Sequence, residues 1–528
     1  MRRGTKSLAV PVGVLLSGLL LTAAFPRWDY SWAAWMALVP LLYVLRGLAA
    51  KKAFLAGFAA GLVHYLTLGY WLLPTLQNYG GLPLAAALPA VALLAAYLAL
   101  YTGLFAMIIA GIRGGAGAAL AAGPAIWVAL EYVRTFLFSG FPWELLGYSQ
   151  YQRLALIQVA DITGVYGISA AVVLVNLAIV CCWLAGRKKT WQQVPVSSRQ
   201  ALLGVTAAAL VIGFIWGYGL WRIGRVEAGL ADAACRRLTV VQGNIDQGHK
   251  WDETFRRTTV QKYLELAGRQ PDLPPDLVIM PETALPFYFT HDRSLTAMVR
   301  RAVRRMNVYL LVGAPYFERR DGQYALYNSA FLLSPAGEVT GRYDKAHLVP
   351  FGEYVPLGRW LPLGNLVTAV GDFDPGRPGR VIRMDGTGLG VQICYEIIFP
   401  GGSRQMAANG ADIIVNLTND AWYGRTSAPY QHFSMAVLRA VETRRPVVRA
   451  ANTGISGWVT PTGQIGDATP IFVDAVRTYA VPKGSGRTFY VRLGDLFAKI
   501  CVIVTLFVLW RRYRTGPGAT LPPGSSRL

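Results

Sequence analysis

A cysteine at the end of an apolar run is the first residue of this chain whose setting suggests chemistry. The run 390–393 predicts a β-strand, and Cys394, Tyr395 and Glu396 follow it directly. A strand that ends in a sharp turn lifts one side chain clear of the sheet and leaves backbone N–H groups beside it, an arrangement that presents a nucleophile to an acyl carbon. A free cysteine is also often a small buried hydrophobe, so Cys394 alone does not decide between a structural and a catalytic role.

Two other predicted strand ends carry the charges that a cysteine nucleophile would need. Glu282 follows the run 276–281, and Lys345 and Glu353 lie in the stretch 343–353. A nucleophile needs a base, and an anionic tetrahedral intermediate needs a cation or N–H donors, so Glu, Lys and Cys supply these roles without a histidine. Each residue also has a structural alternative, as a helix cap for Glu282, a solvated charge for Lys345 and an ion-pair partner for Glu353.

These residues belong to a segment of ordinary soluble composition that alternates strands and helices. The predicted strands are 238–244, 276–281, 308–314, 329–333, 389–393, 413–417 and 447–450, and the predicted helices are 251–268, 294–306 and 428–443. Several of the strands are nearly all apolar, as in sheets that are covered on both faces. The segment therefore predicts an α/β layered domain.

The composition of the whole chain indicates a membrane protein with a soluble part. Of 528 residues, 53% are hydrophobic and only 15% are charged, against about 25% charged residues in soluble domains. Runs long enough to span a bilayer lie at about 8–25, 30–46, 53–73, 85–111, 116–137, 165–185, 201–221 and 494–510. We expect an N-terminal transmembrane domain of seven helices (1–221), a catalytic domain (222–493), a C-terminal transmembrane helix (494–510) and a tail (511–528).

The positive charges predict which side of the membrane each part occupies. Lys and Arg gather before the first span, between spans two and three, between spans six and seven, and after span eight, whereas the alternate loops hold few of them. Since short cytoplasmic loops are enriched in these residues, both termini are expected in the cytoplasm and 222–493 outside it. The net charge of +22 would also suit a nucleic-acid binder. However, the basic residues cluster beside spans and no nucleic-acid-binding motif is present, so we expect no nucleic-acid partner.

Two apolar segments outside the spans are candidates for contact with lipid. The loop 138–164 is rich in aromatic residues, including Trp143, and is expected either to lie at the headgroup level or to form a wall of a lipid-facing site. The segment 354–367, with Trp360, is broken by Pro and Gly and begins directly after Glu353. We expect it to be an arm in the outer-leaflet interface that gates lipid access to the site, the alternative being that it packs on the domain core.

The residues quoted above resemble a known family. Pro281-Glu282, Lys345 and Cys394-Tyr395-Glu396, in this order in an α/β domain, are similar to the carbon–nitrogen hydrolase (nitrilase) superfamily. With membrane spans on both sides, the chain from about 8 to 510 resembles the apolipoprotein N-acyltransferase family. Supporting motifs lie at 241–245, 347–356, 416–424 and 449–458.

The resemblance implies an αββα sandwich and a role for each site residue. Glu282 would be the general base, Lys345 would stabilise the oxyanion, Cys394 would be the nucleophile, and Glu353 would be an accessory glutamate that positions the other three. A nearby cation lowers a thiol pKa, so Lys345 is expected to favour the thiolate of Cys394. The resemblance also places four further residues at the substrate or oxyanion site: Tyr395, whose N–H would complete the oxyanion hole, and Glu396, Trp251 and Trp143. For the two tryptophans, interfacial anchoring is an equal alternative.

The resemblance further implies a two-stage acyl transfer in the bacterial cytoplasmic (inner) membrane. An acyl chain would pass from a phospholipid, typically phosphatidylethanolamine, to Cys394 as a thioester. It would pass next to the N-terminal amine of a diacylated apolipoprotein, with the catalytic domain on the periplasmic side. No cofactor is implied, and the histidines show no metal-ligand spacing.

Two other functions use the same features differently. A membrane-tethered amidase would have the same Glu, Lys and Cys but leaves the many spans unexplained. A transporter with an accessory domain would need ionisable residues in its spans. Spans one to seven hold few of them, mainly Glu131 and Arg134, and the roles of these two and of His64 stay open.

Overall fold

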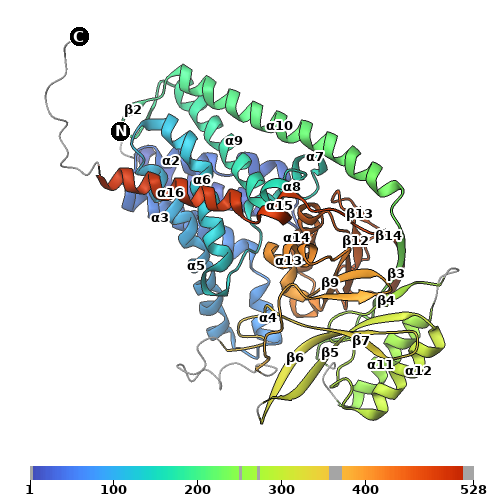
Figure 1. Ribbon diagram of the computed structural model, residues 1–528. Helices are drawn as coiled ribbons and strands as arrows, with labels where there is room; N and C mark the ends of the chain where they lie inside the picture. Colours follow the sequence, from blue (N-terminus) through green and yellow to red (C-terminus); the bar gives the residue numbers. More distant parts are fainter. Residues whose placement is uncertain (1–3, 249–252, 270–273, 321, 356–371, 515–528) are drawn as a thin grey trace.

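The chain folds into a bundle of membrane helices that carries a two-sheet α/β domain at one end (Figure 1). The computed structural model describes residues 4–248, 253–269, 274–320, 322–355 and 372–514. Trp251, Trp360 and most of the predicted interfacial arm (356–367) lie outside these residues.

The helical half contains a helix at seven of the eight predicted spans. Its elements are α1 (Gly4–Ala23), η1 (Ser31–Trp35), α2 (Val39–Leu45), α3 (Ala50–Leu68), α4 (Leu72–Asn78), α5 (Leu84–Ala110), α6 (Gly115–Phe136), α9 (Val165–Gly186), α10 (Ser198–Ala231) and the C-terminal α16 (Leu496–Arg514). The remaining predicted span, expected over 30–46, is interrupted between η1 and α2. Pro40 stands in the first turn of α2, where its missing N–H and fixed φ are tolerated, whereas a continuous helix would place it in the interior.

Length and composition single out a subset of these helices as membrane spans. Within the described residues, α5, α6, α9 and α10 are long and apolar enough to cross a bilayer, and α3 with α4, bent by 53°, makes a fifth if the pair is one span. α10 continues ten residues beyond the predicted end at 221 and leads the chain into the first strand of the α/β domain (Figure 1). The number of crossings and their direction therefore stay predictions.

The α/β domain is built from two six-stranded sheets. The first sheet runs in the order β14 (Ala475–Pro482), β3 (Cys235–Gln242), β4 (Leu277–Ile279), β5 (Tyr309–Arg320), β6 (Gln323–Leu333), β7 (Val339–Asp344). The second runs in the order β13 (Ile465–Gly466), β12 (Gly457–Val459), β11 (Val447–Ala451), β10 (Ile413–Thr418), β9 (Thr387–Ile393), β8 (Val381–Met384). In each sheet three central strands are parallel, β3–β4–β5 and β9–β10–β11, so their carboxyl ends meet at one edge.

Successive side chains on the first sheet point to opposite faces and belong to two different hydrophobic cores. Leu277 and Ile279 of β4 pack toward the second sheet, whereas Val278 packs under α11 (Glu253–Gly268) and α12 (Arg293–Met306). The second sheet is covered on its far side by α13 (Pro400–Ala408) and α14 (Ala428–Thr443), which lie between it and the membrane helices (Figure 1). Because both faces of the sheets are covered at their centres, the strands β4, β9, β10 and β11 are buried at every residue, and the expected αββα sandwich is confirmed.

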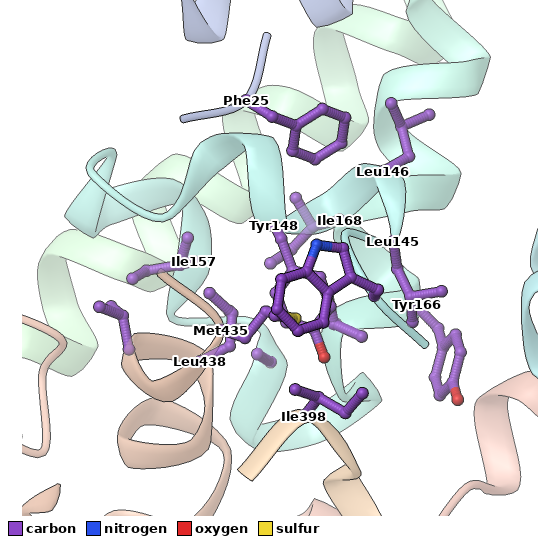
Figure 2. Close-up of a cluster of buried hydrophobic side chains, with 14 of the residues drawn as sticks. Phe25, Leu145, Leu146, Tyr148, Ile157, Tyr166, Ile168, Ile398, Met435 and Leu438 are labelled. Carbon is purple, nitrogen blue, oxygen red and sulfur yellow. The ribbon is translucent and has the colours of Figure 1, made fainter. Parts of the chain in front are cut away.

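The loop 138–164 is buried between the two halves. It contains η2 (Leu137–Ser139), η3 (Leu146–Gln150), α7 (Leu154–Ile157) and α8 (Ala160–Thr163), and residues 142–150 are all buried. Figure 2 shows Leu145 and Tyr148 of this loop in the buried cluster that also contains Met435 and Leu438 of α14. The expectation that the loop lies at the headgroup level is therefore wrong for this stretch. Its aromatic residues are covered by the α/β domain, a contact between segments almost 300 positions apart.

Candidate active site

Glu282, Lys345 and Cys394 are brought together at one end of the sandwich. Glu282 lies three residues after the end of β4, Lys345 follows the last residue of β7, and Cys394 follows the last residue of β9. Lys345 Nζ lies 3.8 Å from Glu282 Oε1. Both charges are close enough to the Cys394 thiol to shift its pKa. The three strand ends predicted to carry chemistry therefore form a single buried cluster.

Lys345 is held by Glu353, the fourth charged residue of the cluster. Its Nζ lies 2.9 Å from Glu353 Oε1 and 2.8 Å from Oε2, and the Val349 N–H donates to Oε2 (2.8 Å). Burial lowers the pKa of Lys345, but the carboxylates of Glu353 and Glu282 outweigh burial and raise the pKa overall. Lys345 is therefore a fixed cation, suited to stabilising an oxyanion and unsuited to accepting a proton.

Asn328, which the sequence did not single out, joins the two glutamates. Its side-chain Nδ2 donates to Glu282 Oε1 (2.8 Å) and to Glu353 Oε1 (2.8 Å). Asn328 lies on β6, one residue before the predicted start of the strand 329–333. A polar residue in an otherwise buried strand needs a hydrogen-bond partner, and this was the signal that could have identified it.

Cys394 sits on a strained turn with a protonated thiol. It opens η5 (Cys394–Ile398) in a left-handed backbone conformation, φ +52°, which non-glycine residues adopt mainly where the surrounding structure imposes it. Burial raises the pKa of the Cys394 thiol to about 12; Glu282 adds to the rise, and Lys345 opposes it without outweighing it. Lys345 lowers the pKa of this thiol as expected, but burial and Glu282 raise it by more, so the thiol is protonated in the resting site. A base must take the thiol proton, and Glu282 is the carboxylate beside it.

Glu396 has a different place from the substrate or oxyanion position expected for it. Its Oε1 accepts from the Tyr343 hydroxyl (2.8 Å) and from the N–H groups of Ala346 (2.8 Å) and His347 (3.0 Å), and its Oε2 accepts from the N–H of Ile393 (2.7 Å). The carboxylate thus ties the turn after β7 to the turn after β9. Glu396 therefore fixes the position of Lys345 relative to Cys394.

Tyr395 and Trp143 connect the site to the membrane half. The Tyr395 hydroxyl donates to the carbonyl of Gly140 (3.3 Å). Trp143 is 2% exposed, its Nε1–H donates to Gln431 Oε1 (2.8 Å), and its ring stacks on that of His432 at 5.7 Å and 28°. Trp143 is therefore a buried contact with α14, and the alternative that it is an interfacial anchor is wrong.

Glu131 and Arg134, two of the three membrane residues whose roles stayed open, support this same loop. Glu131 accepts hydrogen bonds from the Leu146 N–H (2.7 Å) and the Trp127 Nε1–H (2.9 Å). Arg134 donates to the Tyr65 hydroxyl and to the Trp143 carbonyl (3.4 Å). These contacts are structural supports for the loop that carries Trp143.

An apolar cavity lies in the membrane half directly beside this loop. It is lined by residues of α3, α4 and α5 together with Phe141 and Trp143 of the loop. Its remaining lining is almost entirely apolar: Tyr65, Leu68, Gly69, Trp71, Leu72, Val91, Leu94, Ala95 and Leu98. Phe141 connects this cavity to the site, because its ring lies 6.4 Å from that of Tyr395 between ring centres.

Comparison with known proteins covers both halves of the chain. Residues 17–178 match the family profile "Apolipoprotein N-acyltransferase N-terminal domain", and residues 237–481 match "Carbon-nitrogen hydrolase". An apolipoprotein N-acyltransferase of Geobacter metallireducens is 42% identical over 92% of each chain, and that of Haemophilus influenzae is 32% identical over 91% of each. Among solved structures, an amidase from Nesterenkonia sp. has 19% identity and a TM-score of 0.36 over 49% of this chain and 93% of its own. Saccharomyces cerevisiae Nit3 has 18% identity and a TM-score of 0.37 over 47% and 90%.

Proposed function

Because the chain belongs to the apolipoprotein N-acyltransferase family, we propose that it moves an acyl chain from a phospholipid to the N-terminal amine of a diacylated apolipoprotein. Cys394 carries the acyl group between the two substrates. The observation that carries this proposal is the buried cluster of Glu282, Lys345 and Cys394, placed where the α/β domain meets the membrane helices.

In the first half-reaction Glu282 takes the proton of the Cys394 thiol as Sγ attacks the carbonyl carbon of a phospholipid ester. The negative charge that develops on the carbonyl oxygen is stabilised by Lys345, with the N–H of Tyr395 as a second donor. The carbon–oxygen bond then breaks. The leaving oxygen receives the proton from Glu282, lysophospholipid departs, and a thioester remains on Cys394.

In the second half-reaction the apolipoprotein amine attacks the thioester carbon. Glu282 accepts a proton from the attacking nitrogen and returns it to sulfur as the carbon–sulfur bond breaks. The products are an amide on the lipoprotein and the restored thiol. Glu353 and Asn328 keep Lys345 and Glu282 in place through both steps.

The membrane half supplies the lipid setting that this chemistry needs. The apolar cavity between α3, α4 and α5 is suited to an acyl chain of the donor, for which phosphatidylethanolamine is our first candidate. The distribution of Lys and Arg supports a location in the bacterial inner membrane with the α/β domain on the periplasmic side and both termini in the cytoplasm.

The acyl-enzyme is the species to test. Purified protein incubated with phosphatidylethanolamine and no acceptor should gain one acyl mass on Cys394, which hydroxylamine removes at neutral pH. Adding a diacylated lipopeptide should discharge the adduct onto the peptide amine. No adduct on wild-type protein, or transfer that survives in Cys394→Ala, would contradict the proposal.

Matched variants separate the site from the rest of the protein. Glu282→Gln and Lys345→Met should abolish adduct formation, whereas Cys182→Ala, which changes a half-buried thiol in α9, should retain it. Release of ammonia from a soluble amide, without transfer from lipid, would instead favour an amidase.

A further inference from the structure

The backbone carbonyl of Cys394 is held by two side chains outside the Glu–Lys–Cys cluster. Asn416 Nδ2 donates to this carbonyl at 3.3 Å, and His432 Nε2 lies 3.2 Å from it. A carbonyl only accepts hydrogen bonds, so His432 presents an N–H at Nε2. Both side chains are completely buried. They act on the residue that adopts φ +52°, a conformation that needs support from its surroundings.

Arg449 orients both of these side chains at once. Its two terminal nitrogens donate to Asn416 Oδ1 (2.5 Å), to Asp420 Oδ2 (2.7 Å) and to His432 Nδ1 (3.0 Å). His432 Nδ1 also lies 3.0 Å from Asp420 Oδ1. The Cys394 carbonyl requires the hydrogen on Nε2, so the neutral imidazole keeps a lone pair on Nδ1, and this lone pair accepts from Arg449. In agreement, burial and the charge of Arg449 lower the pKa of His432, and Asp420 opposes them without outweighing them, so the imidazole is neutral.

The sheet and the membrane loop make this arrangement rigid. Asn416 of β10 lies in register between Gln392 of β9 and Arg449 of β11, so the backbone ladder sets its position. Trp143 of the loop stacks on the face of His432 (5.7 Å between ring centres), which restricts rotation of the imidazole. Asn416 and Arg449 lie in the motifs at 416–424 and 449–458. The proposed chemistry assigns no role to these two motifs.

We infer that Asn416, His432 and Arg449 form a carbonyl clamp that sets the direction of the Cys394 side chain, and that they are positioning residues for both half-reactions. The described hydrogen bonds of the clamp run to the Cys394 carbonyl, to neighbouring backbone carbonyls, to one another and to Asp420. Fixing the carbonyl of a residue with a defined φ fixes its Cα–Cβ bond and so the approach of Sγ to the acyl carbon. The inference rests on the proposed role of Cys394 as nucleophile.

The test compares two replacements of one residue. His432→Leu removes the N–H that holds the carbonyl, whereas His432→Gln keeps an amide N–H that can donate from nearly the same place. The rate of thioester formation is measured in a single turnover over a range of phosphatidylethanolamine concentrations. A nucleophile misplaced by about 1 Å reacts on the order of 100-fold more slowly. We therefore expect His432→Leu to lower the maximal rate about 10- to 100-fold, with the half-saturating lipid concentration changed less than about twofold.

The conservative variant separates positioning from proton transfer. His432→Gln should recover most of the wild-type rate, because it restores the hydrogen bond and cannot exchange a proton. A His432→Gln variant as slow as His432→Leu would overturn the clamp and make His432 an acid–base group. A His432→Leu variant as fast as wild type would also overturn it. If wild-type protein forms no adduct, the proposed function fails instead, so the two failures are distinguishable.

Two further variants guard against a general loss of structure. Asn416→Ala removes the second donor and should slow thioester formation about tenfold in protein whose melting is monitored in parallel. His291→Leu makes the same chemical change beside the other sheet, where His291 contacts the carbonyl of Phe317 on β5 (2.9 Å), and should acylate at the wild-type rate. Equal losses at 291 and 432, or a wild-type rate in folded Asn416→Ala, would overturn the inference.

Discussion

Removing the side-chain amide of Asn328 tests whether the spacing of the two glutamates matters. Asn328→Leu keeps a similar volume but deletes the donors to Glu282 and Glu353, both at 2.8 Å. A hydrogen bond to a charged group contributes about 1.5–3 kcal/mol, so losing both should destabilise the protein by about 3 kcal/mol or more. Glu282 would then be drawn toward Lys345, 3.8 Å away. A shift of about 1 Å away from the thiol should slow acylation on the order of 100-fold.

Thermal unfolding in detergent and single-turnover acylation measure the two effects separately. A loss of about 3 kcal/mol should lower Tm by about 3–5 °C, because the entropy of unfolding grows with the size of the unit that unfolds. Asn409→Leu is the matched control, since Asn409 Nδ2 donates at the same 2.8 Å to the carbonyl of Gly379, an uncharged acceptor. It should cost about 1 kcal/mol and leave acylation unchanged. Wild-type acylation in Asn328→Leu, or equal effects of both variants, would refute this reasoning.

Three further outcomes follow from burial and charge. Burial raises the pKa of the Cys394 thiol to about 12, and only the thiolate reacts with iodoacetamide. The rate of alkylation of Cys394, followed by mass spectrometry, should therefore rise about tenfold per pH unit from pH 8 to 10. A plateau near pH 8 would contradict this. Burial and the charge of Lys345 lower the pKa of His347 to about 4, below its value of about 6.5 in the unfolded chain. Between these two values the unfolded chain binds more protons than the folded protein. The free energy of unfolding should therefore fall as pH drops from about 6.5 toward 4. His347→Phe should reduce that loss of Tm, and an unchanged slope would exclude His347 as its source. Asp161, in the buried loop, pairs with Arg444 of the α/β domain at 2.8 Å. Asp161→Asn should destabilise the protein by about 3 kcal/mol with little change in the acylation rate of folded protein, and an unaltered Tm would show that the pair does not hold the two halves together.

Local sequence determined the strands, the helices and the identity of the charged cluster. Apolar runs that stop at Glu282 and Cys394 predicted strand ends at those residues, and β4 and β9 end three residues and one residue before them. Parallel central strands bring such ends to one edge of each sheet. Because β4 and β9 lie in different sheets, the packing of one sheet on the other was needed to bring these side chains together. The membrane character of 1–221 was equally evident, because hydrophobicity over about 20 residues is a local property.

Tertiary structure alone decided how the site is held and how it is charged. The partners of Trp143 and Asp161 lie 288 and 283 positions away in the chain, so no local pattern could show that the loop 138–164 would be covered by α14 and not by lipid. The net pKa of the thiol could not be predicted for the same reason. Lys345 lowers this pKa as expected, but desolvation depends on everything packed around Cys394 and here outweighs the cation. Hydrogen bonding and burial are sums over distant contacts, which the sequence encodes only through the completed fold.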